Sequence, residues 1–354
     1  MEKYIAVDSG KFATKAVEYD ITKNAIRKFS FRTRVGEGDF RDDAIENNTV
    51  IVEIDGKTYK IGNGAKANDV ELDTDKKSEI HKLCILTAIA TLVSSNQVDE
   101  VNVAIGLPAK DWSVVSKRID FKEYMLPSGE ITISFKKNSD SNVEKKIFKI
   151  KRSYVFPESI GALFMDETIQ LVSNTSIIGV LDIGNLNLNA TLWQGVELVQ
   201  EKSSTADLGG AILIQELSQE LSFRVAACDE LITANILKDH SGDRHLPDNM
   251  NLSKEQVEES REIIKRVLRE HAEKIKRTCR GRNWSLDVTK LIAIGGTSED
   301  IAPELQEAFG NIIILPEPNF CNALGYLRLM CTKIPEINKI IPLDLVKSNA
   351  KEKK

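Results

Sequence analysis

The chain has 354 residues, of which 42% are hydrophobic and 29% charged, and its formal net charge at pH 7 is -5. These proportions are typical of a folded globular protein and exclude a disordered chain, which carries fewer hydrophobic residues. The length predicts two domains, since single hydrophobic cores stop growing at roughly 250 to 300 residues, and the acidic charge argues against a protein that coats nucleic acid by itself.

The cysteines and the apolar runs predict where the protein works. Five cysteines are scattered without Cys-x-x-Cys spacing, as expected for reduced thiols in a cytoplasm. The longest largely apolar run, residues 83–93, is shorter than the roughly 20 residues that span a bilayer. A strand begins near Tyr4, which leaves no room for a signal peptide. We therefore expect a cytoplasmic protein that does not contact a membrane.

The chain opens with an apolar strand that ends in a carboxylate and a glycine. Residues 4–7 are apolar, Asp8 and Gly10 follow, and residues 14–19 alternate as a half-buried strand does. Glycine at such a point permits a tight turn or a close approach of the backbone to a ligand. The pattern predicts a hairpin of two strands joined by a glycine turn.

This turn has the groups that a bound triphosphate needs. The backbone amides of Ser9, Gly10 and Lys11 are suited to phosphate oxygens, Lys15 to their charge, and Asp8 to a metal ion held through water. A tight hairpin with a solvated lysine accounts for the same segment equally well.

A more polar segment follows, from about residue 26 to residue 70. It contains a predicted hairpin of strands 50–54 and 57–61 around Asp55-Gly56, and it is expected to form a small subdomain inserted into the first lobe. A helix is expected over about 78–95.

Three more strands are expected over residues 101–106, 130–135 and 147–155. The last strand runs into Pro157, Glu158 and Ser159. Because proline suits the first turn of a helix, we expect a helix over about 159–169. Glu158 would then lie where a strand becomes a helix, and stabilisation by the helix dipole is a simpler explanation for this carboxylate than catalysis.

The second half of the chain repeats the opening plan. The apolar strand 177–181 ends at Asp182, Gly184 and Asn185 follow, and a second strand covers 189–193. Asparagines at alternate positions from 185 to 189 replace apolar residues on one face of this hairpin. A polar cleft wall and an exposed edge strand both explain that face.

Two further glycine turns come later in the chain. Gly209-Gly210 precedes a helix that starts near Ala211, and Gly295-Gly296-Thr297 lies between a strand over 290–294 and a helix over 298–309. Between them, a long helix is expected to begin at Ser253 in a capping box with Gln256, and Gly281 is expected to end it. A strand over 311–315 and a helix over about 319–330 complete the elements.

The order of these motifs resembles the actin-like ATPase superfamily, in its phosphate 1, connect 1, phosphate 2, adenosine and connect 2 elements. The motifs are Asp8-x-Gly10 with Lys15, Phe156-Pro157-Glu158-Ser159, Asp182-x-Gly184, Gly209-Gly210, Gly295-Gly296-Thr297 and Cys321-Asn322-Ala323-Leu324-Gly325. They cover nearly the whole chain.

Within that superfamily the chain is most similar to the plasmid-segregation actins of the ParM type. The spacing of the first loop, the Pro-Glu-Ser of connect 1, the turn Gly106-Leu107-Pro108 and the segment Gly62-Asn63-Gly64-Ala65 carry this resemblance. Asn185 and Leu186 stand where that family has small residues, so the phosphate contacts of the second lobe are expected to differ.

The resemblance implies a fold of two RNase H-like α/β lobes, the actin fold, with a nucleotide cleft between them. The first lobe would comprise residues 1–165, with the inserted subdomain at about 26–70. The second lobe would comprise residues 166–318, and the helix and tail over 319–354 would return to the first lobe.

The resemblance also implies residue roles. Asp8 and Asp182 would orient Mg²⁺ and its waters, Lys15 would bind the β and γ phosphates of ATP or GTP, and Glu158 with Asp182 would position and polarise the attacking water. The expected nucleotide-binding residues are Asp8, Ser9, Gly10, Lys11, Lys15, Gly184, Asn185, Gly209, Gly210, Gly295, Gly296 and Thr297.

The function that the resemblance implies is a filament that grows with bound triphosphate and separates plasmid copies after binding a ParR-type adaptor on a centromere-like DNA site. The chain would thus contact itself and the adaptor, and DNA only indirectly. Two other classes share the loops: small-molecule kinases of the sugar and acetate kinase superfamily, and low-turnover scaffolds of the cell-shape and division type.

Overall fold

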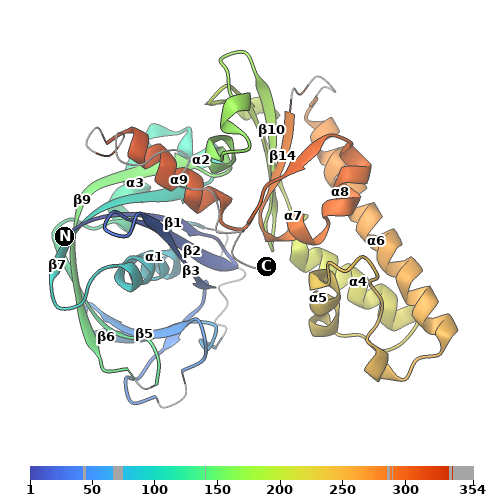
Figure 1. Cartoon of the computed structure of the whole chain (residues 1–354), viewed down its shortest axis with the longest axis horizontal. Helices are drawn as coiled ribbons and strands as arrows, with labels where there is room; N and C mark the ends of the chain where they lie inside the picture. Colours follow the sequence, from blue (N-terminus) through green and yellow to red (C-terminus); the bar gives the residue numbers. More distant parts are fainter. Residues whose placement is uncertain are drawn as a thin grey trace. The chain divides into compact units, whose positions relative to one another are not determined.

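The fold is known from a computed structural model (Figure 1), which describes residues 1–42, 45–66, 75–139, 141–284, 288, 290–334 and 337. The chain divides into two compact units. Unit 1 comprises Met1–Gln170 and Phe320–Lys354, and unit 2 comprises Leu171–Asn319. The end of the expected inserted subdomain, from residue 67, and the tail from residue 338 lie outside the described residues.

Unit 1 contains a nine-stranded sheet in the order β3-β2-β1-β7-β9-β8-β5-β6-β4. Its strands are β1 (Glu2–Ser9), β2 (Ala13–Asp20), β3 (Ala25–Arg32), β4 (Val35–Glu37), β5 (Thr49–Ile54), β6 (Lys57–Gly62), β7 (Val98–Leu107), β8 (Glu130–Lys136) and β9 (Glu144–Pro157). β1 pairs with β2 in the antiparallel direction and with β7 in the parallel direction. The apolar run that opens the chain is therefore a central strand, which explains why it is hydrophobic on both faces.

The helices of unit 1 cover both faces of the central strands. They are α1 (Glu79–Leu92), α2 (Ala109–Trp112), α3 (Val115–Met125) and α9 (Cys321–Thr332). Figure 1 shows α1 on one face of β1 and β2 and α9 on the other, with the sheet curving around α1 to β5 and β6. Ten of the 14 residues of α1 and 11 of the 12 residues of α9 are buried, since each helix packs on the core along most of its surface. Ser78 caps α1 by accepting a hydrogen bond from the His81 backbone N–H.

Two features of unit 1 bear on the expected inserted subdomain. The predicted hairpin is confirmed, with positive φ at Asp55 (52°) and Gly56 (75°), as the favoured two-residue hairpin turn requires. Residues 25–32, however, form β3, which pairs with β2 along its whole length and so extends the main sheet.

The predicted helix over 159–169 is wrong. Pro157 is the last residue of β9, where it lies opposite Leu107, and Ser159 has a left-handed φ of 72°. Two short 3-10 helices follow, η1 (Ile160–Phe164) and η2 (Ile169–Leu171). A Cβ at Gly161 would lie 2.7 Å from the carbonyl oxygen of Cys321, so this segment packs on the start of α9. This tertiary contact overrides the helix preference that the proline suggested.

Unit 2 contains a sheet in the order β12-β11-β10-β14-β15, with β13 also paired to β11. The strands are β10 (Ile177–Ile183), β11 (Leu188–Gln194), β12 (Glu197–Leu198), β13 (Ser204–Ala206), β14 (Lys290–Ile294) and β15 (Ile312–Ile314). β10 is antiparallel to β11 and parallel to β14. This repeats the arrangement of β2, β1 and β7, of which the sequence predicted the hairpin.

The helices of unit 2 pack a second core against this sheet. They are α4 (Gly210–Arg224), α5 (Glu230–Lys238), α6 (Lys254–Gly281), α7 (Gly296–Asp300) and α8 (Ala302–Phe309), with the 3-10 turns η3 (Gln200–Lys202) and η4 (Asp248–Met250). The predicted capping box at the start of α6 is present. The expected helix over 298–309 is two helices, broken at Ile301. As predicted, α6 ends at Gly281, and the left-handed residue that follows is Asn283 (φ 54°).

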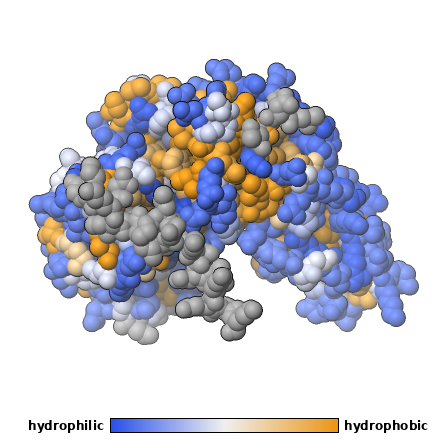
Figure 2. Space-filling model, turned by 45° about the horizontal axis from the view of Figure 1, so that its top comes forward, coloured by the Kyte–Doolittle hydropathy of each residue, from blue (hydrophilic) through white to orange (hydrophobic). Residues whose placement is uncertain are grey.

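The surface of unit 2 is strongly polar along α6. Arg266 pairs with Glu220 of α4 at 2.5 Å, and Arg269 pairs with Glu307 of α8 at 3.0 Å. Figure 2 shows hydrophilic residues over most of the visible face of these helices. The charged run in this part of the chain is thus a solvated helix face. Within the described ranges, no helix combines the length and the hydropathy needed to cross a membrane.

Candidate functional site

The first glycine turn lies between β1 and β2 of unit 1. The strand register places Asp8 opposite Lys15, whose Nζ lies 3.6 Å from Asp8 Oδ2. The N–H of Gly10 donates to the carbonyl of Ala13 at 3.1 Å, which closes the turn. A Cβ at Gly10 would lie 2.9 Å from that carbonyl oxygen and 3.2 Å from Lys15 Nζ. The turn therefore requires glycine, and the Lys15 ammonium lies directly over its backbone.

A buried network of hydrogen bonds among three hydroxyl groups and one imidazole supports this turn. Ser9 Oγ lies 2.9 Å from His81 Nδ1 and 3.1 Å from Thr14 Oγ1, which is 3.0 Å from Thr33 Oγ1. Thr33 donates in turn to the carbonyl of Gly10 at 2.6 Å. Local sequence patterns did not predict this network, because its members come from separate segments of the chain. A polar residue at a fully buried position of β2, Thr14, was the one available signal.

His81 is a neutral member of the network. Burial, helped by the positive charges of Lys76 and Lys11, lowers the pKa of His81 to about 3. The imidazole therefore carries no charge near neutral pH. It orients the Ser9 hydroxyl without adding charge to a site whose other basic groups are lysines.

Glu158 reaches the same turn from the end of β9. Its N–H donates to the carbonyl of Leu107 at 2.8 Å, and its carboxylate is 2.9 Å from Lys76 Nζ. Lys76 also donates a hydrogen bond to the carbonyl of Ser9. Unit 1 thus brings Asp8, Lys15 and Glu158 into one network. Sequence reasoning missed Lys76 because it belongs to no glycine turn and follows a polar segment.

The second glycine turn lies between β10 and β11 of unit 2. Asp182 lies opposite Asn189, and the N–H of Gly184 donates to the carbonyl of Asn187 at 2.9 Å. The first amides of α4 bind this turn, since Gly210 N–H donates to Gly184 at 3.0 Å and Ala211 N–H donates to Asn185 at 2.6 Å. These two amides therefore hold the loop together.

The third glycine turn, between β14 and α7, packs directly on the second. Gly295 has a φ of 89°, and a Cβ there would lie 2.4 Å from the carbonyl oxygen of Ile183 and 2.9 Å from Asp182 Oδ1. Thr297 Oγ1 donates to the carbonyl of Gly184 at 2.9 Å. The sequence-predicted residues of unit 2 are thus neighbours in the fold.

The glycines of unit 2 have different surroundings. A Cβ at Gly209 would lie 2.5 Å from the carbonyl oxygen of Asn185, and one at Gly210 would lie 2.6 Å from Thr297 Oγ1. A Cβ at Gly296 would meet nothing within 4 Å. Packing between loops accounts for Gly209, Gly210 and Gly295, whereas Gly296 has open space beside its Cα.

The Asp8 carboxylate is suited to contact a magnesium ion that keeps most of its water ligands. In the part of the chain that the structure describes, no three His, Cys, Asp or Glu side chains gather as a metal cluster. Mg²⁺ is commonly held by one or two carboxylates together with substrate phosphates and waters. Asp8, with a side chain only 9% exposed at the end of β1, fits that kind of contact.

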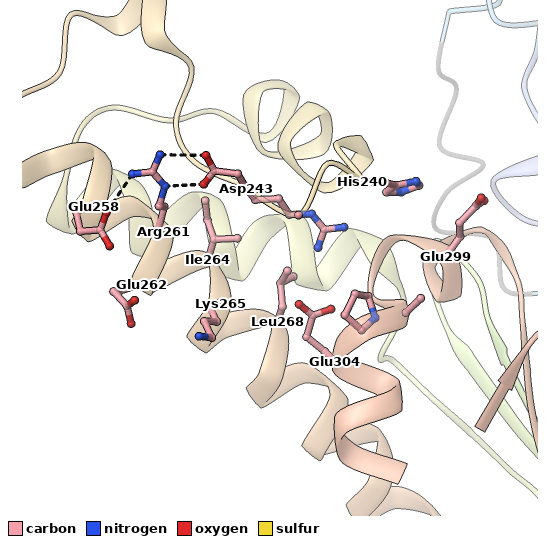
Figure 3. Close-up of a pocket in the computed structure, with 14 residues that line it drawn as sticks. His240, Asp243, Glu258, Arg261, Glu262, Ile264, Lys265, Leu268, Glu299 and Glu304 are labelled. Atoms are coloured by element: carbon pink, nitrogen blue, oxygen red, sulfur yellow. Dashed lines mark hydrogen bonds and ion pairs between the residues drawn. The ribbon is translucent and has the colours of Figure 1, made fainter. Parts of the chain in front are cut away.

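A separate cavity of about 590 Å³ lies in unit 2 between the first half of α6, the loop before it and the start of α8 (Figure 3). Arg261 lines this cavity and donates hydrogen bonds to Asp243 at 2.7 Å and to Glu258 at 3.0 Å. None of the residues predicted to bind nucleotide lines this cavity. The sequence motifs and the cavity therefore mark different places in unit 2.

The first part of the chain matches a known protein family. Residues 6–161 match the family model described as the N-terminal domain of actin-like proteins. None of the curated proteins matches the sequence significantly.

Solved structures of similar fold cover almost the whole chain. The Alp12 filament structure is 21% identical, with a TM-score of 0.69 over 94% of this chain and 99% of that chain. Ta0583, an archaeal actin homolog solved in complex with ADP, is 18% identical, with a TM-score of 0.69 over 92% and 98%. A 15-stranded ParM filament from Clostridium botulinum is 19% identical, with a TM-score of 0.67 over 94% and 99%. At these identities the likeness concerns the fold, and it confirms the predicted fold of two α/β lobes.

Proposed function

We propose that the chain binds a nucleoside triphosphate, hydrolyses it and assembles into filaments, because residues 6–161 match the N-terminal domain of actin-like proteins and solved filament proteins share the fold. One observation carries the proposal: the first glycine turn, a lysine above it and the Glu158 carboxylate form one partly buried network in unit 1. The ADP complex and the filament structures of proteins with the same fold support nucleotide binding and self-association.

The proposed roles follow from the chemistry of each group. Lys15 and the amides of residues 9–11 would hold the phosphates, and Glu158 would accept a hydrogen bond from the attacking water. The water oxygen bonds to the γ phosphorus as the bond to the β–γ bridging oxygen breaks, which releases inorganic phosphate and a nucleoside diphosphate. Bound Mg²⁺, held by Asp8 and Asp182, would neutralise phosphate charge.

In unit 2, the proposed contacts are those of Gly184, Asn185, Gly209, Gly210, Gly295, Gly296 and Thr297 with the phosphates, ribose and base. Gly296 is the strongest of these candidates, because its Cα borders open space. We propose ATP or GTP as the nucleotide.

For the cell, we propose plasmid DNA segregation through a ParR-type adaptor that binds DNA. The net charge of -5 favours an adaptor over direct DNA contact.

Glu158→Ala is the experiment that tests the hydrolytic role. The variant should bind nucleotide and polymerise, but phosphate release should slow by roughly 10² to 10⁴, the range for loss of a general acid or base. Filaments should therefore persist. Phosphate release, pelleting and light scattering with ATP and with GTP measure these effects.

A monomeric wild-type protein, with hydrolysis unchanged by Glu158→Ala, would refute the proposal. Turnover that depends on an added metabolite would favour the kinase class instead.

A further inference from the structure

Lys76 is a largely buried lysine beside the proposed catalytic carboxylate. Its Nζ lies 2.9 Å from Glu158 Oε1, and the two side chains are only 10% and 9% exposed. The same ammonium donates a hydrogen bond to the carbonyl of Ser9, inside the first glycine turn. Lys76 therefore joins the end of β9 to the β1–β2 turn.

Fold stability alone is a weak explanation for this buried pair. Removing a lysine and a carboxylate from water has a large desolvation penalty, and replacing such a pair by apolar residues is often neutral or stabilising. The start of α1 is already capped by Ser78 without help from Lys76. A lysine at this place is better explained by what its charge does next to the turn.

The charge balance around the turn favours a polyanion. Lys15 pairs with Asp8 and Lys76 pairs with Glu158, while the positive charge of Lys11 acts on nearby His81, which is neutral because its pKa is about 3. Among these described residues, three positive groups against two negative ones leave an excess of one positive charge. Lys76 supplies the positive charge in contact with Glu158.

We infer that Lys76 is a positioning residue: it holds the Glu158 carboxylate beside the turn and places a positive charge next to the terminal phosphate of a bound triphosphate. The inference rests on the proposed nucleotide function. Glu158 acts at the terminal phosphate in that function. The Lys76 ammonium, 2.9 Å from the Glu158 carboxylate, would therefore lie near the terminal phosphate as well. A diphosphate lacks that terminal group. Lys76 therefore raises the affinity for triphosphate more than the affinity for diphosphate.

Lys76→Ala is the direct test. Turnover should fall by about 10²-fold, as when a reacting group is misplaced by about 1 Å. The ratio of ATP to ADP affinity, measured by competition with a fluorescent nucleotide, should fall roughly tenfold or more, as expected for loss of a hydrogen bond to a charged group. Lys76→Arg, which keeps the charge, should restore most of the affinity ratio but only part of the turnover.

Lys77→Ala is the matched control. Lys77 is the next residue, and its side chain is 37% exposed and pairs with Asp120 at 2.5 Å. The control removes one positive charge from the same segment without touching Glu158. Its turnover and affinity ratio should equal those of the wild type.

Lys76→Met combined with Glu158→Gln covers the case in which Lys76→Ala does not fold. The double variant keeps both side-chain lengths and removes both charges, so no buried charge is left unpaired. Its ATP to ADP affinity ratio should lie below that of Glu158→Gln alone.

The outcomes separate the two proposals. A wild type that binds neither ATP nor GTP refutes the proposed function, and the inference with it. A wild type that hydrolyses nucleotide, beside Lys76 variants with unchanged turnover and affinity ratio, refutes the inference alone. A fall in turnover that Lys77→Ala shares, with the affinity ratio unchanged in every variant, also refutes it.

Discussion

Single residues at the glycine turns are constrained by backbone contacts. Gly295 has a φ of 89° and no room for a Cβ against Ile183 and Asp182, whereas Gly296, its neighbour, has nothing within 4 Å. The sequence presents these two glycines as equivalent parts of one motif. Their surroundings assign a packing role to Gly295 and leave Gly296 as the proposed ligand contact.

Gly295→Ala should lower the free energy of unfolding by about 1–3 kcal/mol, the penalty for holding a non-glycine residue in a strained conformation, and the overlap with Ile183 adds to it. Gly296→Ala is the matched control and should unfold close to the wild type. Chemical denaturation of both variants measures the difference. Equal stability of the two variants would contradict the assignment.

Residue identities at the site were predictable where a motif marks them. Asp8, Gly10 and Lys15 stand in a strand–turn–strand pattern that the structure reproduces. Lys76 and the hydroxyl network were not predictable, since Lys76, Thr33 and His81 come from three separate segments. Such contacts depend on the tertiary fold, which local patterns do not determine.

At the scale of the elements, predictions from local sequence patterns were correct where no tertiary contact competed with the local preference. The capping box of α6 and the Asp55-Gly56 hairpin are local, and both were predicted. The helix expected after Pro157 failed because Ser159 is left-handed and the segment packs on α9, far along the chain. No pattern within the segment carries that information.

A buried histidine in the long helix α6 leads to a prediction about how the stability of the fold depends on pH. His271 is fully buried in this helix, and burial lowers its pKa to about 4, against an ordinary value of 6.5. Between these values the unfolded chain binds a proton that the folded chain does not. Stability should therefore fall as the pH drops from about 6.5 to 4.

His271→Leu removes this titration and should flatten the dependence, by up to about 1.4 kcal/mol per pH unit. Urea unfolding at several pH values from 4 to 7 measures the slope. His81 also has a lowered pKa and should leave a residual slope in the variant. A slope that His271→Leu does not change would contradict the prediction.

For the whole molecule, the proposed filament needs contact surfaces between copies. Phe223, near the end of α4, is 86% exposed, and Leu231, near the start of α5, is 70% exposed. Both flank the turn over residues 225–229, which Ser218 and Ser222 fix by hydrogen bonds to the Cys228 carbonyl. Burial of such large apolar side chains favours association.

Phe223→Glu should raise the critical concentration for assembly by tenfold or more, since large aromatic residues often dominate interface energies, with truncations costing about 2 kcal/mol or more. Val196→Ser, at a side chain 49% exposed on the same unit, is the control and should assemble as the wild type does. Pelleting over a range of protein concentrations measures both. Normal assembly of Phe223→Glu would exclude this surface from the filament.

The contact between Gly161 and α9 bears on how the protein is made. A Cβ at Gly325 would lie 2.2 Å from the Cα of Gly161, so α9 and η1 meet backbone to backbone. All of unit 2, residues 171–319, is synthesised between these two segments. On the ribosome, unit 2 can therefore complete its fold first. The β1–β2 turn and Glu158 gain the support of α9 only when this helix emerges. A chain interrupted after unit 2 would therefore carry every predicted nucleotide-binding residue, but those of the first unit would lie on an unfinished fold.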